Sequence, residues 1–409
     1  MAEVKLKDYA QITRPQNFEE IMLLADRLQG KTVKMVNSTK DGGGVAEMLH
    51  RVVPLFNELG LNMKWETIEG NAEFFDATKA FHNALHGKEV EITKEMFKVH
   101  NEVNDLNAKK MTFNEDIVVI HDPQPVGLIQ MKDKSPAKWV WRCHIDTATP
   151  HPQVWKHLEQ YITKYDASIF SAPSFAKQLP IPQVMIYPAI DPFAEKNRIL
   201  TKAEIDSVRQ KFDLPNDKPI ITQVSRFDYL KDPIGVFETY KLVKKHHDCV
   251  FVYAGGAASD DPEGTAVLNE LQERAAGDKD FRILLLPPFS DFDINGLQRA
   301  STIVMQKSLK EGFGLTVTEA LWKKKPVIAG AVGGIPLQVI NNFTGMLVHS
   351  VEGAAYKIRY LLNNPEVGER MGEYGHEHVR EKFLLTRNMR NYLLLFLSLQ
   401  HPGESVIEI

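Results

Sequence analysis

The stretch Ile220-Ile-Thr-Gln-Val224, running on through Ser225-Arg-Phe-Asp-Tyr-Leu-Lys-Asp-Pro233, decides the fold of this chain. It carries a short apolar run into a turn of polar residues and then into a helix-length segment, Pro233–His247. A second apolar run, Val250–Ala254, follows that segment. Strand, helix and strand in this order are typical of a parallel sheet covered by helices on both faces. An α/β fold is therefore predicted.

Similar runs form two series along the chain. The first comprises Val33–Asn37, Ile117–His121, Trp139–His144, Ala167–Phe170 and Val184–Tyr187, and the second continues with Arg282–Leu286, Ile303–Gln306, Pro326–Ala329 and Gly345–Val348. Between the series lies Gln178–Pro192, a proline-dense and therefore stiff, non-helical crossing. We predict two doubly wound, Rossmann-like domains, residues 1–185 and 186–385, that face each other across a cleft and close about this crossing. A helix and tail over 386–409 either cap the second domain or cross back onto the first.

The amino-acid composition excludes several classes of function. The 409 residues have a formal net charge of −4, so there is no basic excess of the kind a nucleic-acid-binding domain shows. Cys143 and Cys249 are far apart, which argues against a disulfide framework and against a zinc site. Residues 1–30 lack an apolar signal segment, and nowhere does an uncharged apolar run approach 18 residues. We expect a cytoplasmic protein that binds neither nucleic acid nor membrane.

The second domain offers a site for a sugar nucleotide. In Glu311-Gly-Phe-Gly-Leu-Thr-Val-Thr-Glu319, two carboxylates flank a glycine turn that opens into a helix over Leu315–Trp322. Backbone amides at such a turn and helix start can meet an anion, while Glu311 can hold sugar hydroxyls and Glu319 a ribose diol. Arg226 and Lys231, placed after a strand, can neutralise a diphosphate. A surface loop and solvated surface charge remain the alternatives.

The first domain offers two further groups of polar residues at strand ends. Ser38-Thr-Lys-Asp-Gly-Gly-Gly44 follows the first strand and could bring the amides of Gly43 and Gly44 to a phosphate, although a plain turn is equally consistent with it. His121-Asp122 and His144-Ile-Asp146 close two neighbouring strands. Because such residues share one edge of a parallel sheet, we expect them to line one pocket for substrate.

One pair of acidic residues has the spacing of a metal-binding motif. Asp291-Phe-Asp293 matches the Asp-x-Asp pattern with which some transferases bind a divalent ion. It also precedes a short helix over Ile294–Ala300, and aspartate is a preferred N-cap residue. N-capping is the simpler interpretation, so a magnesium site is possible but is not predicted, and no cofactor is expected to be required.

Taken together, the motifs resemble the retaining glycosyltransferases of the GT-B fold, in the family that includes sucrose and trehalose synthases. The resemblance spans nearly the whole chain and is close to the trehalose glycosyltransferring synthases. It is carried by the following stretches: Asn37-Ser-Thr39, Gly42-Gly-Gly-Val-Ala-Glu47, Phe81-His-Asn-Ala-Leu85, His121-Asp-Pro-Gln-Pro125, Trp141-Arg-Cys-His-Ile-Asp146, Arg226 with Lys231, and Glu311-Gly-Phe-Gly-Leu-Thr-Val-Thr-Glu-Ala320.

The resemblance implies a reaction and a role for each site residue. Glucose would pass from a nucleoside diphosphate glucose, such as UDP-glucose, to free glucose, giving trehalose with retention, in one direction or in both. Front-face attack assisted by the leaving phosphate would need no covalent intermediate and no metal bridge. Arg226 and Lys231 would hold the diphosphate, Glu311 the donor sugar, Glu319 the ribose, and His144 the sugar near the reaction centre. The remaining implied positions are Gly43, Gly44, Gly312, Phe313, Gly314, Leu315 and Thr316 toward the donor, and Asp122 and Asp146 toward the acceptor.

Several points stay open. After Asp146 the chain reads Thr147-Ala-Thr-Pro-His151, where the family has a Ser-x-Pro-Asn-like segment, so the donor is better supported than the acceptor. A trehalose phosphorylase would share many of these sequence motifs. A non-catalytic protein that binds a nucleotide sugar would share the fold. A glycosidase fits less well, because Glu311 and Glu319 are placed to grip hydroxyls rather than to flank one bond. The preferred base, the direction of flux and acceptor strictness are not encoded in these motifs. We expect a homo-oligomer, most simply a dimer.

Overall fold

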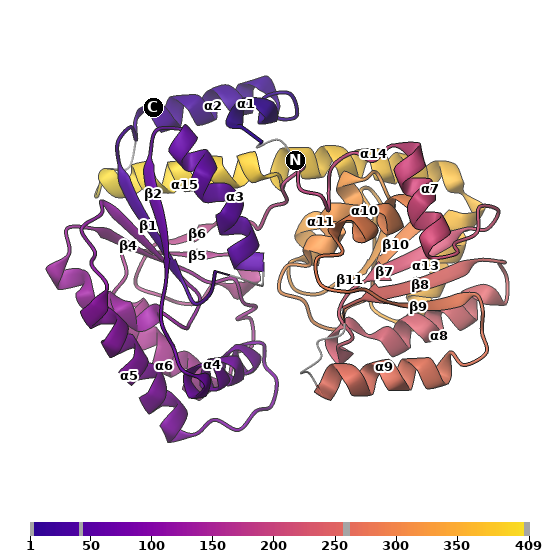
Figure 1. Ribbon diagram of the computed structural model, residues 1–409, viewed down its shortest axis with the longest axis horizontal. Helices are drawn as coiled ribbons and strands as arrows, with labels where there is room; N and C mark the ends of the chain where they lie inside the picture. Colours follow the sequence, from indigo (N-terminus) through magenta and orange to yellow (C-terminus); the bar gives the residue numbers. More distant parts are fainter. Residues whose placement is uncertain (1–3, 41–43, 257–261, 405–409) are drawn as a thin grey trace. The chain divides into compact units, whose positions relative to one another are not determined.

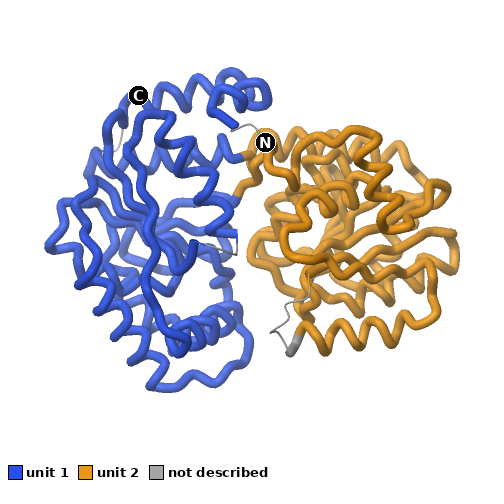
Figure 2. The backbone as a smooth tube through the Cα atoms, in the orientation of Figure 1, with its two compact units in different colours: residues 1–188, 385–409 blue, residues 189–384 orange. Residues whose placement is uncertain are grey.

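The computed structural model of the protein describes residues 4–40, 44–256 and 262–404. It divides into two compact units, shown in blue and orange in Figure 2: unit 1 comprises residues 1–188 and 385–409, and unit 2 comprises residues 189–384. The boundary expected from the sequence lay between residues 185 and 186. Each unit is built on one parallel six-stranded sheet with helices on both of its faces (Figure 1). The predicted α/β, doubly wound architecture is confirmed.

Unit 1 contains a sheet of strand order β2-β1-β3-β4-β5-β6. Its strands are β1 (Thr32–Asn37), β2 (Asn62–Thr67), β3 (Ile117–His121), β4 (Lys138–Arg142), β5 (Ala167–Phe170) and β6 (Gln183–Met185). Its α-helices are α1 (Leu6–Tyr9), α2 (Pro15–Asp26), α3 (Gly44–Glu58), α4 (Ala72–Leu85), α5 (Lys94–Lys110), α6 (Pro152–Ile162) and α15 (Leu385–Gln400), with 3-10 turns η1 (Val126–Lys134) and η2 (Pro173–Phe175).

Unit 2 contains a sheet of strand order β12-β11-β10-β7-β8-β9. Its strands are β7 (Ile220–Val224), β8 (Val250–Gly255), β9 (Phe281–Leu285), β10 (Ile303–Gln306), β11 (Val327–Gly330) and β12 (Met346–Val348). Its helices are α7 (Lys202–Lys211), α8 (Pro233–Lys244), α9 (Pro262–Arg274), α10 (Asp291–Ala300), α11 (Leu315–Trp322), α12 (Ile335–Gln338), α13 (Val351–Asn363) and α14 (Pro365–Lys382), with the 3-10 turn η3 (Tyr229–Lys231).

Most residues in the strands of unit 2 are apolar because helices cover both faces of the sheet. One face packs Ile221, Phe251 and Tyr253 against helices α8, α9 and α13. On the other face, Val224 and Val252 pack against α7 and α10. Successive side chains of a strand point to opposite faces, so a strand buried on both faces is mostly apolar along its whole length.

The last helix belongs to unit 1. Helix α15 packs on α2 and α3, where Arg390 Nε donates to Glu20 Oε2 at 2.6 Å and Phe396 lies 6.1 Å from the Phe56 ring. Thr386 Oγ1 accepts a hydrogen bond from Thr13 Oγ1 at 3.1 Å. Of the two positions that the sequence left open for this helix, it takes the one on the first unit.

Candidate functional site

Two histidines meet at the carboxyl edge of the unit 1 sheet. His121 is the last residue of β3, and His144 lies two residues beyond the end of the adjacent strand β4. His121 Nδ1 is 3.0 Å from His144 Nε2, and the two rings stack with centroids 5.3 Å apart. The expectation that these two turns share one rim is therefore confirmed, although β4 is shorter than predicted and ends at Arg142.

Asp122 holds the two turns together. Its backbone adopts a left-handed conformation, φ 65°, in which its Oδ1 accepts a hydrogen bond from the His144 amide at 2.8 Å. Its own amide donates to the Arg142 carbonyl at 2.7 Å, and its carbonyl accepts from Trp141 Nε1 at 3.0 Å. In this structure Asp122 fixes the position of His144, and contact with an acceptor stays a prediction.

Burial sets the charges on this rim. Desolvation, with a contribution from nearby Arg142, lowers the pKa of His121 to about 3 and holds the pKa of His144 well below its usual value. Desolvation also raises the pKa of Asp122 to about 6. The imidazoles are therefore neutral at pH 7, and His144 can act as a neutral hydrogen-bond donor or acceptor but carries no positive charge.

The segment after the histidine rim is fixed by its own hydrogen bonds. Asp146 Oδ1 accepts from the Ala148 amide at 2.8 Å, and Lys177 Nζ donates to the Ala148 carbonyl at 3.0 Å. Thr147, the first residue of the segment that differs from the expected family pattern, is buried and donates its hydroxyl to the Phe175 carbonyl at 2.7 Å. The departure at Thr147 therefore has a packing role. The acceptor-side role of Asp146 remains a prediction.

The glycine turn after β1 is only partly described. Gly43 lies outside the described residues, while Gly44 is the first residue of α3. A Cβ added at Gly44 would meet no atom within 4 Å, so none of the described atoms demands glycine there. Before the turn, Asn37 Nδ2 donates to the Thr39 carbonyl at 2.8 Å. Phosphate contact by Gly43 and Gly44 stays a prediction.

In unit 2 an ion pair lies at the carboxyl ends of two neighbouring strands. Lys231 follows β7 and Glu311 follows β10, and these strands pair in parallel at the middle of the sheet. Lys231 Nζ is 2.6 Å from Glu311 Oε2, and the two side chains are only 16% and 11% exposed. Ser308 Oγ donates to the same carboxylate oxygen at 3.1 Å. The two residues assigned to diphosphate and sugar are thus direct partners.

A second ion pair, which the sequence analysis missed, lies beside the first. Lys307, directly after β10, is buried and pairs through Nζ with Asp232 Oδ2. Gln223 links the two pairs, since its Nε2 donates to the Lys231 carbonyl at 2.8 Å and its Oε1 accepts from the Lys307 amide at 2.9 Å. The only sequence signal was a lysine at a strand end next to the glutamate motif.

Arg226 is more exposed than Lys231 and Lys307. Its side chain is 71% exposed, and its closest acidic partner is Asp228, 3.4 Å from Nη2 to Oδ2. An exposed guanidinium in such a long contact is free to reorient toward an arriving anion. The same loop therefore carries one partly buried, pre-positioned cation, Lys231, and one exposed cation, Arg226.

The glycine turn of the motif is shaped by backbone contacts. Gly314 adopts φ +83° and is the N-cap residue of α11, and Gly312 accepts from the Gly334 amide at 2.9 Å. Leu315 and Thr316 open the helix, where first-turn amides carry the positive end of the helix dipole. Thr316 Oγ1 donates to Gln306 Oε1 at 3.0 Å. Phe313 is buried, which gives it a packing role in this turn.

Glu319 lies one turn further along α11, buried beside two lysines. Lys196 Nζ is 4.0 Å from Glu319 Oε1 and 3.6 Å from Asp291 Oδ1, so it bridges the two carboxylates. Lys323 Nζ donates to the Glu319 carbonyl at 3.2 Å and to Gln298 Oε1 at 2.7 Å. Burial lowers the pKa of Lys323 to about 7. Neither lysine stood out in the sequence.

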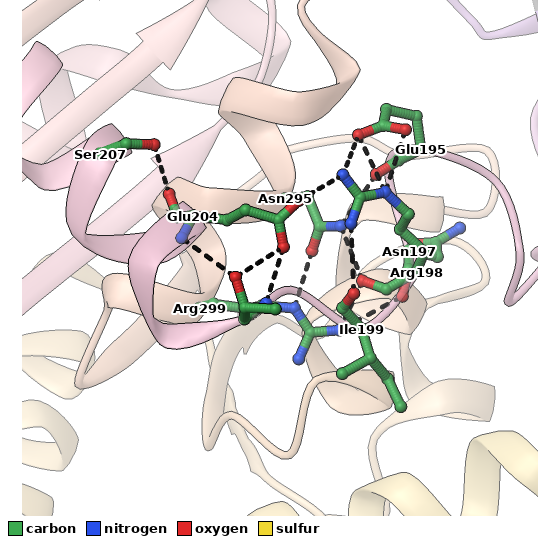
Figure 3. Close-up of polar contacts among 9 residues, drawn as sticks. Glu195, Asn197, Arg198, Ile199, Glu204, Ser207, Asn295 and Arg299 are labelled. Atoms are coloured by element: carbon green, nitrogen blue, oxygen red, sulfur yellow. Dashed lines mark hydrogen bonds and ion pairs between the residues drawn. The ribbon is translucent and has the colours of Figure 1, made fainter. Parts of the chain in front are cut away.

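Figure 3 shows a network of hydrogen bonds that involves the residues on either side of Lys196. Asn295 Nδ2 donates to the carbonyls of Glu195 and Arg198 at 2.8 and 2.9 Å. Arg299 Nη2 donates to the Arg198 carbonyl at 2.9 Å. The residues on either side of Lys196 are thereby tied to α10.

The capping interpretation of Asp291 and Asp293 was wrong. Ser290 is the N-cap residue of α10, and both aspartates lie within the first helical turn, where their charge complements the helix dipole. Asp293 pairs with Lys211 at 2.8 Å, and Asp291 faces Lys196. Across residues 4–40, 44–256 and 262–404, no three His, Cys, Asp or Glu side chains gather in a way that could hold a metal ion. Within the same residues, no helix is both long and apolar enough to span a membrane.

Comparison with known proteins adds to this geometry. Residues 35–177 match the family model of the trehalose synthase N-terminal domain, and residues 204–378 match that of glycosyl transferases group 1. The trehalose synthase of Thermococcus litoralis is 42% identical over 400 residues, which cover 96% of this chain and 97% of that protein. The trehalose phosphorylase of Pleurotus pulmonarius is 26% identical, covering 95% of this chain and 60% of its own length.

The fold also matches solved structures. A structure described as trehalose-6-phosphate from E. coli bound with UDP-2-fluoro glucose superposes with a TM-score of 0.72, at 14% identity, over 91% of this chain and all of that one. At that identity the likeness concerns the fold alone.

Proposed function

This chain belongs to the trehalose synthase family of glycosyltransferases, and we propose that it transfers glucose with retention from a nucleoside diphosphate glucose to free glucose, forming trehalose. The observation that carries the proposal is the Lys231–Glu311 ion pair at the carboxyl ends of β7 and β10. A cation for a departing diphosphate and a carboxylate for sugar hydroxyls lie there in direct contact, and nucleotides bind doubly wound sheets at such strand ends.

Donor binding would exchange partners within this pair. The diphosphate carries negative charge that competes with Glu311 for Lys231, and Arg226 is exposed and able to swing onto the same phosphates. Glu311, released from Lys231, would accept hydrogen bonds from two hydroxyls of the donor glucose. The amides of Leu315 and Thr316 would support the phosphate, and Glu319 would accept from the ribose diol.

The transfer step would break the bond between glucose C1 and the diphosphate oxygen and form one between C1 and the acceptor hydroxyl oxygen. The acceptor proton would pass to the leaving phosphate on the same face, which retains the α configuration. Lys231 and Arg226 would stabilise the charge on the diphosphate as the bond breaks, and removal of one such donor typically costs about 2.7–4 kcal/mol. No metal and no covalent intermediate are required by this scheme.

Unit 1 would supply further residues that bind sugar. His144, neutral and held by Asp122 and His121, would hydrogen bond to a glucose hydroxyl near the reacting carbon. Asp146 would contact the acceptor, and Gly43 and Gly44 would approach the phosphates. We also propose a cytoplasmic homodimer, in which the buried thiols of Cys143 and Cys249 stay reduced.

Trehalose phosphorolysis is the second candidate, because fungal trehalose phosphorylases align with nearly the whole chain. Such an enzyme would use inorganic phosphate and would give glucose 1-phosphate. Glu319 distinguishes the two, since a ribose diol is present only in a nucleotide.

The test runs both reactions on the purified chain and on Glu319→Ala. We expect release of nucleoside diphosphate from UDP-, ADP- or GDP-glucose that depends on added glucose and is reduced by Glu319→Ala. The phosphorylase reaction would instead give glucose 1-phosphate from trehalose and phosphate, at equal rates in both proteins, with no turnover of any nucleotide sugar. That result would contradict the proposed synthase activity and support phosphorolysis.

A further inference from the structure

Two consecutive residues of the loop after β7 are tied to Lys307, the residue that directly follows β10. The Lys231 carbonyl accepts a hydrogen bond from Gln223 Nε2 at 2.8 Å, and Gln223 Oε1 accepts in turn from the Lys307 amide at 2.9 Å. The next residue, Asp232, pairs through its Oδ2 with Lys307 Nζ. Lys307 therefore holds this loop at two points, one through its backbone amide and one through its side chain.

Asp232 is the residue at which the loop turns into α8. It closes the 3-10 turn η3 by donating its amide to the Tyr229 carbonyl at 3.0 Å, and it caps α8 by accepting from the Gly235 amide through Oδ1 at 3.0 Å. A Cβ added at Gly235 would lie 2.1 Å from Asp232 Oδ2, so a side chain there would displace the carboxylate from Lys307. Both carboxylate oxygens of Asp232 have partners, and the backbone next to Lys231 is held in place.

The proposed exchange of partners breaks one of the ties between the two loops. When Lys231 leaves Glu311 for the diphosphate, the 2.6 Å contact between their side chains is lost. The pair of Lys307 with Asp232 does not depend on that contact, because Asp232 also caps α8 and the Lys307 side chain is only 8% exposed. Opening so buried a pair would leave a charge without a partner, which is strongly unfavourable. The second pair therefore stays intact while the first changes partners.

We propose that Lys307 is a positioning residue for Lys231, an inference that rests on the proposed use of a nucleoside diphosphate glucose. Through Asp232 and Gln223 it holds the backbone of the loop while the Lys231 ammonium moves to the departing diphosphate. Stabilisation of a leaving group depends on where the cation lies, and a displacement of about 1 Å can lower a rate roughly 10²-fold. Lys307 acts through Lys231 and does not itself contact the donor.

A double-mutant cycle tests this role. It measures kcat and KM with glucose and each of UDP-, ADP- and GDP-glucose, in the wild type, Lys307→Met, Lys231→Ala and the variant that carries both substitutions. We expect Lys307→Met alone to lower kcat/KM by roughly 10- to 100-fold, with most of the loss in kcat. In the Lys231→Ala background the same substitution should lower kcat/KM by less than about twofold, because no ammonium is left to position.

Two further variants separate positioning from folding, with rates measured below every melting transition. Lys307→Met combined with Asp232→Asn removes both charges, while asparagine keeps the helix cap and accepts the left-handed backbone. This variant should melt closer to the wild type than Lys307→Met does, yet keep the loss in kcat. Lys244→Met is the control, because Lys244 Nζ pairs at 2.6 Å with Asp280, which lies just before β9 at the amino ends of the strands. Its kcat should equal that of the wild type.

Four results would overturn the inference while the proposed reaction stands. Lys307→Met could turn over at the wild-type rate, or could cause an equal loss with and without the Lys231 ammonium, which would show that it acts independently of Lys231. Recovery of kcat together with the melting temperature in the variant that lacks both charges would reduce Lys307 to a role in folding. Calorimetry in which Lys307→Met further weakens nucleoside diphosphate binding to Lys231→Ala would make Lys307 a direct ligand.

One result would overturn both proposals. If the wild type turns over none of the three nucleotide sugars with glucose, the proposed function fails, and the positioning role of Lys307 in that reaction fails with it.

Discussion

Replacing Glu311 by Gln tests the partner exchange at the donor site, because it should move two measured quantities in opposite directions. Glu311 Oε2 lies 2.6 Å from Lys231 Nζ. Two unit charges at that separation attract each other by about 1.6 kcal/mol at the dielectric constant of water and by about 6 kcal/mol at an effective value of 20. The released carboxylate regains hydrogen bonds, so the lower figure is the better guide. Without this competitor, a free nucleoside diphosphate should bind about tenfold more tightly.

Transfer from the complete donor should become slower in the same variant. Glu311→Gln loses charge-assisted hydrogen bonds to the sugar hydroxyls, worth about 1.5–3 kcal/mol, so kcat/KM for nucleoside diphosphate glucose should fall roughly 10- to 150-fold. Calorimetry with the diphosphate and initial rates with the donor provide the two measurements. Glu373→Gln, which removes the same charge from an exposed pair with Lys324, is the control and should change neither. Diphosphate binding that is weaker or unchanged in Glu311→Gln would refute the partner exchange.

Three further predictions follow from the described contacts. Lys231→Ala and Arg226→Ala should each lower kcat/KM by about 10²–10³-fold. The effect of Arg226→Ala should be smaller at high salt, because the Arg226 side chain is exposed. Near-normal rates in both variants would exclude the two residues from the diphosphate site. Because burial raises the pKa of Asp122 to about 6, from 3.8, the folded state binds more protons than the unfolded state between these values, and ionised Asp122 lowers stability above pH 6. Asp122→Asn should therefore be up to about 3 kcal/mol more stable than the wild type at pH 7.5 and equal to it near pH 3. A difference that does not change with pH in denaturant titrations would contradict this. Gly333→Ala would place a Cβ 1.7 Å from the Glu311 carbonyl oxygen. It should lower the free energy of unfolding by about 1–3 kcal/mol more than Gly277→Ala does, because Gly277 is also left-handed but a Cβ there would meet nothing within 4 Å. Equal melting temperatures of the two variants would show that the turn can shift to accept the methyl group.

The sequence predicted most strands because buried parallel strands leave a strong apolar signal. Ile117–His121, Ala167–Phe170, Ile220–Val224 and Ile303–Gln306 were placed with their correct bounds. Strand β2 was missed because it lies at the edge of its sheet, where alternate residues face solvent and its apolar run is broken. The helical position of Asp291 was missed because an aspartate before an apolar helix resembles a cap, and only the backbone shows that Ser290 occupies that place.

The candidate site was predictable in part. The histidine rim follows from topology, since adjacent parallel strands end at one edge. The pairing of Lys231 with Glu311 could not be predicted from the sequence, because a contact between residues 80 positions apart depends on the order of β7 and β10 in the sheet. Lys196 and Lys307 were missed for the same reason, as a single lysine carries no local pattern. The roles of Glu311, Glu319, Arg226 and Lys231 were inferred from their chemistry and placement, whereas the role of His144 at the donor sugar came from the family resemblance.

The most direct test of the proposed reaction is NMR of the purified protein with nucleoside diphosphate glucose and glucose labelled with ¹³C at C1. The proposed function predicts α,α-trehalose with one labelled ring, formed in equal amount to free nucleoside diphosphate. A β-linked product would contradict retention. The absence of any labelled disaccharide with all three nucleotides would contradict transfer to glucose itself.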